Sequence, residues 1–77
     1  MSVTVYSLPN CVACENTKRM LDRGGVDYNV IDMSKDEDAF NMVKDLGYQA
    51  APVVVTDEDH WGGFEIDKIT ALYEATA

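Results

Sequence analysis

The sequence has few positive charges and no long apolar run. Its 77 residues include 6 lysines and arginines against 14 aspartates and glutamates, a formal net charge of −8. So acidic a chain argues against nucleic acid and anionic membranes as partners. No stretch approaches the roughly 20 apolar residues of a membrane-spanning helix, and the segment Met1-Ser2-Val3-Thr4 lacks the basic and apolar regions of a signal peptide. We therefore expect a cytoplasmic protein that binds neither membranes nor nucleic acid.

Histidine and cysteine, the residues that most often bind zinc, are also scarce. The chain has one histidine, His60, and two cysteines, Cys11 and Cys14. A structural zinc ion takes four nitrogen or sulfur ligands, so one copy of the chain cannot complete such a site, and we expect no bound metal. His60 follows three acidic residues, and we predict that it is a solvated turn residue without a catalytic role.

The two cysteines lie three positions apart, after a strand-like run and at the start of a helix-like run. Residues at i and i+3 share a helix face, and a disulfide needs Cα atoms roughly 4.4–6.8 Å apart, so this pair can close with little backbone movement. A helix start carries unpaired N–H groups and about half a positive charge, so the pKa of a thiol there can fall from about 8.5 to about 7. We predict that Cys11 is the exposed nucleophile and Cys14 the covered, resolving cysteine.

Three other interpretations of the cysteine pair stay open. A disulfide over so short a loop constrains the unfolded chain little, so it would be a weak structural link. Two chains together could supply the thiolates for a metal ion or an iron–sulfur cluster. The cysteines could also be inert. A redox dithiol is the favoured interpretation, because thiols in the cytoplasm are kept reduced and a pair there is expected to turn over.

The apolar pattern predicts a single domain, residues 1–77, with the element order β-α-β-α-β-β-α. Strands are expected over 3–6, 26–32 and 53–56, with a short fourth strand that begins at Trp61. Helices are expected over 15–21, from the capping box at 34–37 to 46, and from 66 onwards. A strand, a helix and a strand within about 30 residues form a parallel pair. The predicted fold class is therefore α/β, a four-stranded mixed sheet flanked by three helices.

Local patterns add expectations about helix starts and helix faces. Asn10 is predicted to cap the first helix, and Ser34 with Glu37 matches the S-x-x-E capping box of the second. Helical spacing predicts that the second helix buries Ala39, Phe40, Val43 and Leu46 and that the last buries Ile66, Ile69, Leu72 and Tyr73.

Four motifs match a known family in order and in spacing. They are Cys11-Val12-Ala13-Cys14, Leu46-Gly47-Tyr48, Ala51-Pro52-Val53-Val54 and His60-Trp61-Gly62-Gly63-Phe64. With these motifs, which cover nearly the whole chain, the sequence resembles the NrdH redoxins of the glutaredoxin group. The resemblance implies a thioredoxin fold.

The resemblance also implies a thiol-disulfide oxidoreductase. NrdH redoxins are reduced by thioredoxin reductase, which takes its electrons from NADPH. They then reduce the disulfide that class Ib ribonucleotide reductase forms during deoxyribonucleotide synthesis. We accordingly expect a monomer with no bound cofactor, whose partners are thioredoxin reductase and the large subunit of ribonucleotide reductase.

The same resemblance assigns partner contacts around the dithiol. These residues are Val12, Ala13, Ala51, Pro52, Trp61, Gly62, Gly63 and Phe64. The bond between Ala51 and Pro52 is expected to be cis, and the main chain before Pro52 is expected to pair with the extended chain of a substrate protein.

Two departures from the family keep an alternative open. Leu8 stands where a lysine or arginine is usual, so the Cys11 thiol is expected to be less acidic. Gly62 replaces a serine and creates a Gly-Gly pair, which glutaredoxins use to hold glutathione. A glutathione-dependent glutaredoxin is therefore the alternative. The electron supply through thioredoxin reductase is favoured because Val12-Ala13 replaces the Pro-Tyr of glutaredoxins and Phe64 stands where polar residues would bind glutathione.

Overall fold

The chain forms a small mixed sheet with helices on both faces. The computed structural model describes residues 2–75, so residues 1 and 76–77 of the predicted domain lie outside the described part. The elements are β1 (Val3–Ser7), α1 (Val12–Arg23), β2 (Asn29–Asp32), α2 (Glu37–Asp45), β3 (Val53–Thr56), β4 (His60–Gly62) and α3 (Ile66–Ala75). The predicted order of strands and helices is thus confirmed.

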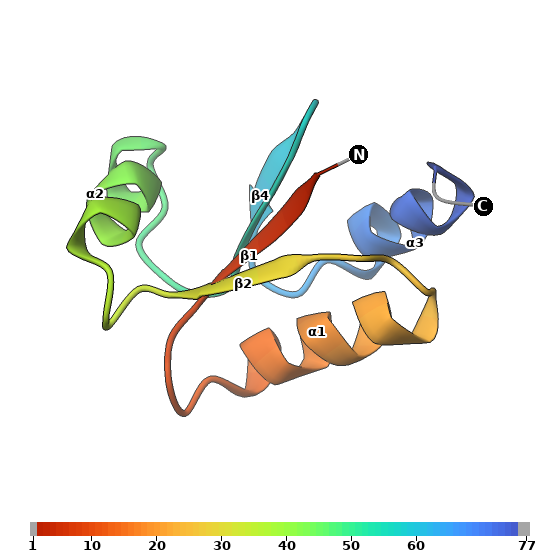
Figure 1. Cartoon of the computed structure of the whole chain (residues 1–77), viewed down its shortest axis with the longest axis horizontal. Coiled ribbons are helices and arrows are strands. Elements are labelled where there is room, and N and C mark those ends of the chain that lie inside the picture. The colour runs from red at the N-terminus through yellow and green to blue at the C-terminus, as the bar shows by residue number, and fades with distance from the viewer. Residues whose placement is uncertain (1, 76–77) are drawn as a thin grey trace.

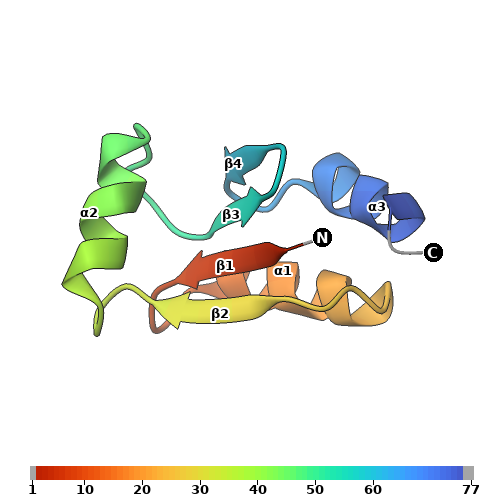
Figure 2. The ribbon, with the colours of Figure 1, turned by 45° about the horizontal axis from the view of Figure 1, so that its top comes forward.

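The four strands form one sheet in the order β2-β1-β3-β4, and Figure 2 shows them in this order from β2 at the bottom to β4 at the top. β1 and β2 are parallel because α1 carries the chain back between them, whereas the other two pairs are antiparallel. Tyr6 lies opposite Val53 in the β1–β3 register. The end of β1, which leads to the cysteines, and the start of β3, which follows Pro52, therefore lie side by side.

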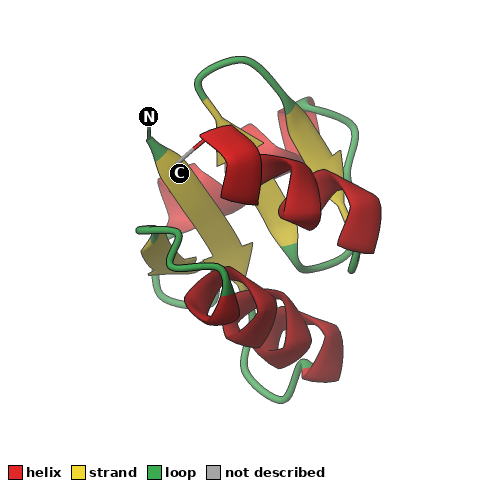
Figure 3. Cartoon of the chain, turned by 90° about the vertical axis from the view of Figure 1, so that its right-hand side faces the viewer, coloured by secondary structure: helices red, strands yellow, loops and turns green. Residues whose placement is uncertain are grey.

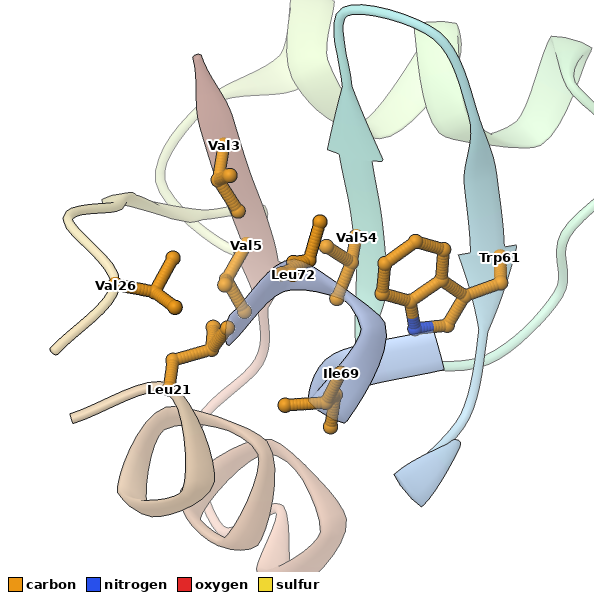
Figure 4. Packing of buried hydrophobic residues seen from close by; sticks show 8 residues of the cluster. All are labelled: Val3, Val5, Leu21, Val26, Val54, Trp61, Ile69 and Leu72. Carbon is orange, nitrogen blue, oxygen red and sulfur yellow. The ribbon is translucent and has the colours of Figure 1, made fainter. Parts of the chain in front are cut away.

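The helices divide between the two faces of the sheet. α1 and α3 lie on one face and α2 on the other (Figures 1 and 3). Successive residues of a strand point to opposite faces, so Val54 packs with α1 and α3 while Val53 packs with α2. The α1/α3 side buries Val3, Val5, Leu21, Val26, Val54, Trp61, Ile69 and Leu72, which Figure 4 shows. The α2 side buries Met33, Ala39, Val43 and Val53.

The first helix begins one residue later than its predicted cap. Asn10 has a left-handed φ of 60°, whereas a helix cap is extended. Cys11 has φ −110° and ψ 105°, and its sulfur accepts a hydrogen bond from the N–H of Cys14. Cys11 is therefore the N-cap, and the prediction for Asn10 is wrong.

The second helix is also capped by a different residue. The hydroxyl of Ser34 donates to Asp32 Oδ1 at 2.6 Å and so is used within the preceding turn. Asp36 Oδ1 accepts from the N–H of Ala39 at 3.0 Å and caps α2. The predicted capping box at Ser34 is wrong because a carboxylate closer to the helix takes its place, which the helix dipole also favours.

Three residues of the predicted helix stripes are exposed. Phe40 and Leu46 are 46% and 40% exposed to solvent. The reason is that α2 buries only a narrow stripe, at Ala39 and Val43, against the small sheet. Ile66 is 51% exposed because it lies at the first residue of α3, one turn before the buried Ile69.

The second strand is shorter than predicted. It begins at Asn29, although Val26 still buries its side chain in the core from the preceding loop.

Candidate active site

The two cysteines form a disulfide at the start of α1, directly after β1. Their Cα atoms are 5.2 Å apart, within the range expected from the spacing. Cys14 is fully buried, whereas Cys11 is partly exposed. Cys11 is therefore the more accessible cysteine of the pair and Cys14 the covered one, as the sequence predicted for their exposure.

The main chain of α1 supplies an electrostatic setting for Cys11. The N–H of Cys14 donates to Cys11 Sγ at 3.0 Å, and the N–H of Glu15 donates to the Cys11 carbonyl at 3.2 Å. These N–H groups belong to the first turn, where the positive end of the helix dipole lies. After reduction of the disulfide, the N–H of Cys14 and the helix dipole would stabilise a thiolate on Cys11.

A hollow of about 530 Å³ gives access to Cys11 from the side of β2. Its apolar lining includes Leu8, Val12 and Val30. Its basic residue is Lys18, which forms an ion pair with Glu15 on the same helix. No unpaired lysine in this hollow therefore replaces the positive charge that is missing at Leu8.

The loop before β3 lies beside the cysteine loop. The Ala51–Pro52 bond is cis, as the family resemblance implied. Pro52 is fully buried, and its carbonyl accepts a hydrogen bond from Gly63 at 2.8 Å. Within residues 2–75, the main chain of residues 49–51 makes no hydrogen bond. The N–H and C=O groups of Ala51 therefore have no hydrogen-bond partner among the described residues.

The structure brings several of the predicted contact residues together. Ala51, Gly62 and Gly63 line one hollow of about 380 Å³. Gly63 has φ 86°, a conformation that glycine adopts at little cost. Val12 is 76% exposed at the start of α1, and Ala13 is partly buried behind it. The predicted contact residues thus fall into two groups, one at the start of α1 beside Cys11 and one around the hollow that Ala51 lines.

Trp61 is the main exception among the predicted contact residues. It is only 6% exposed, and its ring lies in the core between β3 and α3 (Figure 4). Phe64 is partly buried and packs against the same cluster. The Trp61 ring thus offers no surface to a partner, in contrast to the contact role expected of it, because β4 turns alternate residues into the core.

Two residues without a predicted catalytic or binding role, Tyr48 and His60, are in contact, and Tyr48 lines the hollow that Ala51 lines. Tyr48 Oη lies 2.6 Å from His60 Nδ1, and the rings are edge to face with centroids 5.6 Å apart. His60 is exposed as predicted, but it begins β4 instead of lying in a turn. A Cβ on Gly62 would lie 2.8 Å from Tyr48 Cδ1. The glycine at position 62 is the one feature of the sequence that could have indicated this contact, because a larger residue there would collide with the Tyr48 ring.

In residues 2–75, no three or more histidine, cysteine, aspartate or glutamate side chains are grouped so that they could hold a metal ion. None of the described helices has the length and apolar character needed to cross a membrane.

Known proteins resemble this chain over nearly its full length. The glutaredoxin family model matches residues 3–61. The sequence is 32% identical over 75 residues to the glutaredoxin-like protein NrdH of Escherichia coli K12, covering 97% of this chain and 93% of that protein. It is 31% identical over 70 residues to the NrdH protein of Lactococcus lactis, covering 91% and 97%. The solved NrdH-redoxin of Escherichia coli matches with a TM-score of 0.91 and 32% identity, covering 94% of this chain and 95% of that one.

Proposed function

The chain belongs to the glutaredoxin family and, within it, to the NrdH-type redoxins, and from this premise we propose that it carries electrons from thioredoxin reductase to a class Ib ribonucleotide reductase. As a family member with the Cys11–Cys14 pair, it is a thiol-disulfide oxidoreductase. The observation that carries the proposal is the position of this disulfide at the start of α1, with Cys11 accessible and Cys14 buried.

The proposed reaction transfers two electrons in two exchange steps. The Cys11 thiolate attacks one sulfur of the partner's disulfide, and the partner's other sulfur leaves as a thiolate. The Cys14 thiolate then attacks the Cys11 sulfur, which closes the observed disulfide and releases the second partner sulfur as a thiolate. The partner gains two electrons and, after protonation, two protons. Thioredoxin reductase reverses the process on the redoxin with electrons from NADPH.

The partner's disulfide segment is proposed to lie along the loop before Pro52. Extended segments bind through main-chain hydrogen bonds where a receptor offers unpaired N–H and C=O groups. Ala51 offers both, as no described residue pairs with them. Gly62 and Gly63 line the same hollow as Ala51.

Supply by thioredoxin reductase is favoured over supply by glutathione. The glutathione alternative depends on the Gly62-Gly63 pair, and both glycines have local reasons to be glycine. Gly62 makes room for the ring of Tyr48, and Gly63 has a positive φ. In addition, the solved structure of the related Escherichia coli protein is described as the basis for a thioredoxin-like activity profile of a glutaredoxin-like protein.

We further propose that the redoxin works in the cytoplasm as a monomer with no bound cofactor, and that the nicotinamide and flavin chemistry stays in the reductase. The mechanism needs only two sulfurs, which alternate between dithiol and disulfide. Both are present in one chain, 5.2 Å apart at their Cα atoms.

The electron donor can be tested directly with insulin as the acceptor. NADPH oxidation is followed with thioredoxin reductase in one arm and with glutathione and glutathione reductase in the other. We expect turnover in the first arm and little in the second. The Cys11→Ser variant is the matched control for background exchange. Turnover with glutathione alone would overturn the proposed electron supply while leaving the dithiol chemistry intact.

The proposed acceptor is tested separately with a class Ib ribonucleotide reductase. Deoxyribonucleotide formation should depend on the redoxin when NADPH and thioredoxin reductase are the only electron source. Insulin reduction without any support of ribonucleotide reductase would contradict the proposed target.

A further inference from the structure

The loop between α2 and β3 is joined to β4 through the side chain of Tyr48. The Tyr48 hydroxyl lies 2.6 Å from His60 Nδ1, and the two rings are perpendicular within a few degrees, with an interplanar angle of 86°. The main-chain N–H of Tyr48 donates to the Val43 carbonyl at the end of α2 at 3.3 Å. One residue thus connects the end of α2 to the strand on the other side of the hollow that Ala51 lines.

The space for the Tyr48 ring exists because residue 62 is glycine. A Cβ on Gly62 would lie 2.8 Å from Cδ1 and 3.2 Å from Cε1 of the ring, closer than carbon atoms pack. The φ of Gly62 is not positive, unlike that of Gly63. The main chain at 62 therefore accepts other residues, and the specific benefit of glycine here is the room it leaves for Tyr48.

Residues 49–51 depend on such anchors for their shape. Their main chain makes no hydrogen bond to any described residue. The loop is held at one end by Tyr48 and at the other by Pro52, whose carbonyl accepts from Gly63 at 2.8 Å. A loop that loses one anchor samples more conformations, and a partner that binds it must then order it, which weakens binding.

We propose that Tyr48 is a positioning residue for disulfide exchange with protein substrates. Held by His60 and seated on Gly62, its ring keeps the main chain of Ala51 in the shape that pairs with an extended substrate segment. This inference rests on the proposed function only in taking a protein disulfide as the substrate, and it does not depend on which reductase supplies the electrons.

The test therefore needs no reductase. The redoxin is first reduced with dithiothreitol, and the dithiothreitol is then removed. Its reaction is followed with insulin, whose disulfide lies in a polypeptide, and with 5,5′-dithiobis(2-nitrobenzoate), a small disulfide that reports the reactivity of the Cys11 thiolate alone. For Tyr48→Ala we expect a rate constant with insulin that is lower by about tenfold, equivalent to about 1.4 kcal/mol. The rate constant with the small disulfide should stay near the wild-type value.

Matched variants separate the ring from its hydrogen bond and from the fold. Tyr48→Phe keeps the ring and should lose less of the insulin rate than Tyr48→Ala. Gly62→Ala displaces the ring and should slow insulin selectively. The double variant Gly62→Ala/Tyr48→Ala has no Tyr48 ring for the new methyl group to displace. Its rate constant with insulin should therefore be no lower than that of Tyr48→Ala.

Two results would overturn the inference. One is an unchanged insulin rate in both Tyr48→Ala and Gly62→Ala. The other is an equal loss with insulin and the small disulfide, which would place the effect of Tyr48 on the cysteines or on the fold. Circular dichroism establishes folding of each variant. If Tyr48→Ala does not fold, Gly62→Ala and His60→Ala decide, and wild-type insulin rates in both would reject the positioning role. If the proposed supply by thioredoxin reductase were wrong, this would appear only in the assay of NADPH oxidation with that reductase, and not in the experiments with pre-reduced redoxin.

Discussion

At the scale of single residues, the chemistry depends on two cysteines that differ in exposure. The first turn of α1 places the Cys11 sulfur beside the N–H of Cys14 and directs the Cys14 sulfur into the protein. A buried sulfur cannot meet a partner, but it can attack the neighbouring Cys11 once a mixed disulfide has formed. The proposed order of attack thus follows from where the helix begins.

This order predicts different fates for the two serine variants. Cys14→Ser should retain attack by Cys11 and accumulate a stable mixed disulfide with a protein substrate, because no sulfur resolves it. Cys11→Ser should form no adduct. Non-reducing electrophoresis and intact mass measurement detect the adduct. Full multiple turnover by Cys14→Ser in the thioredoxin reductase assay would contradict the assigned roles.

At the scale of elements, α1 and α3 are joined by a close contact that places the active-site helix on the sheet. Tyr73 Oη donates to the Met20 carbonyl at 2.5 Å, and its ring lies where a Cβ on Gly24 would be. Gly24 has φ −87°, so its main chain would accept alanine. The glycine that ends α1 thereby also allows the close approach of α3.

We predict that Gly24→Ala destabilises the protein by about 1–3 kcal/mol, the usual cost of an overpacked contact. The free energy of unfolding in urea measures the effect. In a Tyr73→Ala background the same substitution should cost much less, since the ring is gone. An equal cost in both backgrounds would show that the effect of Gly24 does not come from the ring.

At the scale of the whole molecule, stability should depend on alkaline pH through Tyr28. Burial, and next the hydrogen bond that its hydroxyl donates to Asp22 Oδ1 at 2.8 Å, raise the pKa of Tyr28 from 10.0 to about 12. The folded state therefore favours the neutral phenol. This contribution is complete below pH 10 and is lost as the pH rises from 10 to about 12.

The measurement is the urea stability of wild type and Tyr28→Phe across that pH range. The wild type should have a higher free energy of unfolding than Tyr28→Phe because of the hydroxyl, and this difference should shrink toward pH 12. Ultraviolet titration should show that Tyr28→Phe lacks one late-titrating tyrosine. A stability difference that does not change with pH would refute the linkage to Tyr28. Because the hydroxyl joins the segment before β2 to α1, the effect concerns global unfolding.

The order of elements, the dithiol at a helix start and the family could be predicted from the sequence because each depends on neighbours in the chain. Alternating valines, glycines after helices and the C-x-x-C spacing are local signals. They correctly indicated that Cys11 is the more exposed cysteine, although it is only partly exposed, and that Cys14 is covered.

Only the tertiary structure decided which apolar residues the core has room for. Phe40 remains exposed while Trp61 is buried, because burial depends on which face of a four-stranded sheet each side chain meets. The contact of Tyr48 with His60 and Gly62 likewise joins residues that are 12 and 14 positions apart in sequence and form no regular pattern. Local periodicity determines which elements form, whereas packing between distant segments determines what each side chain touches.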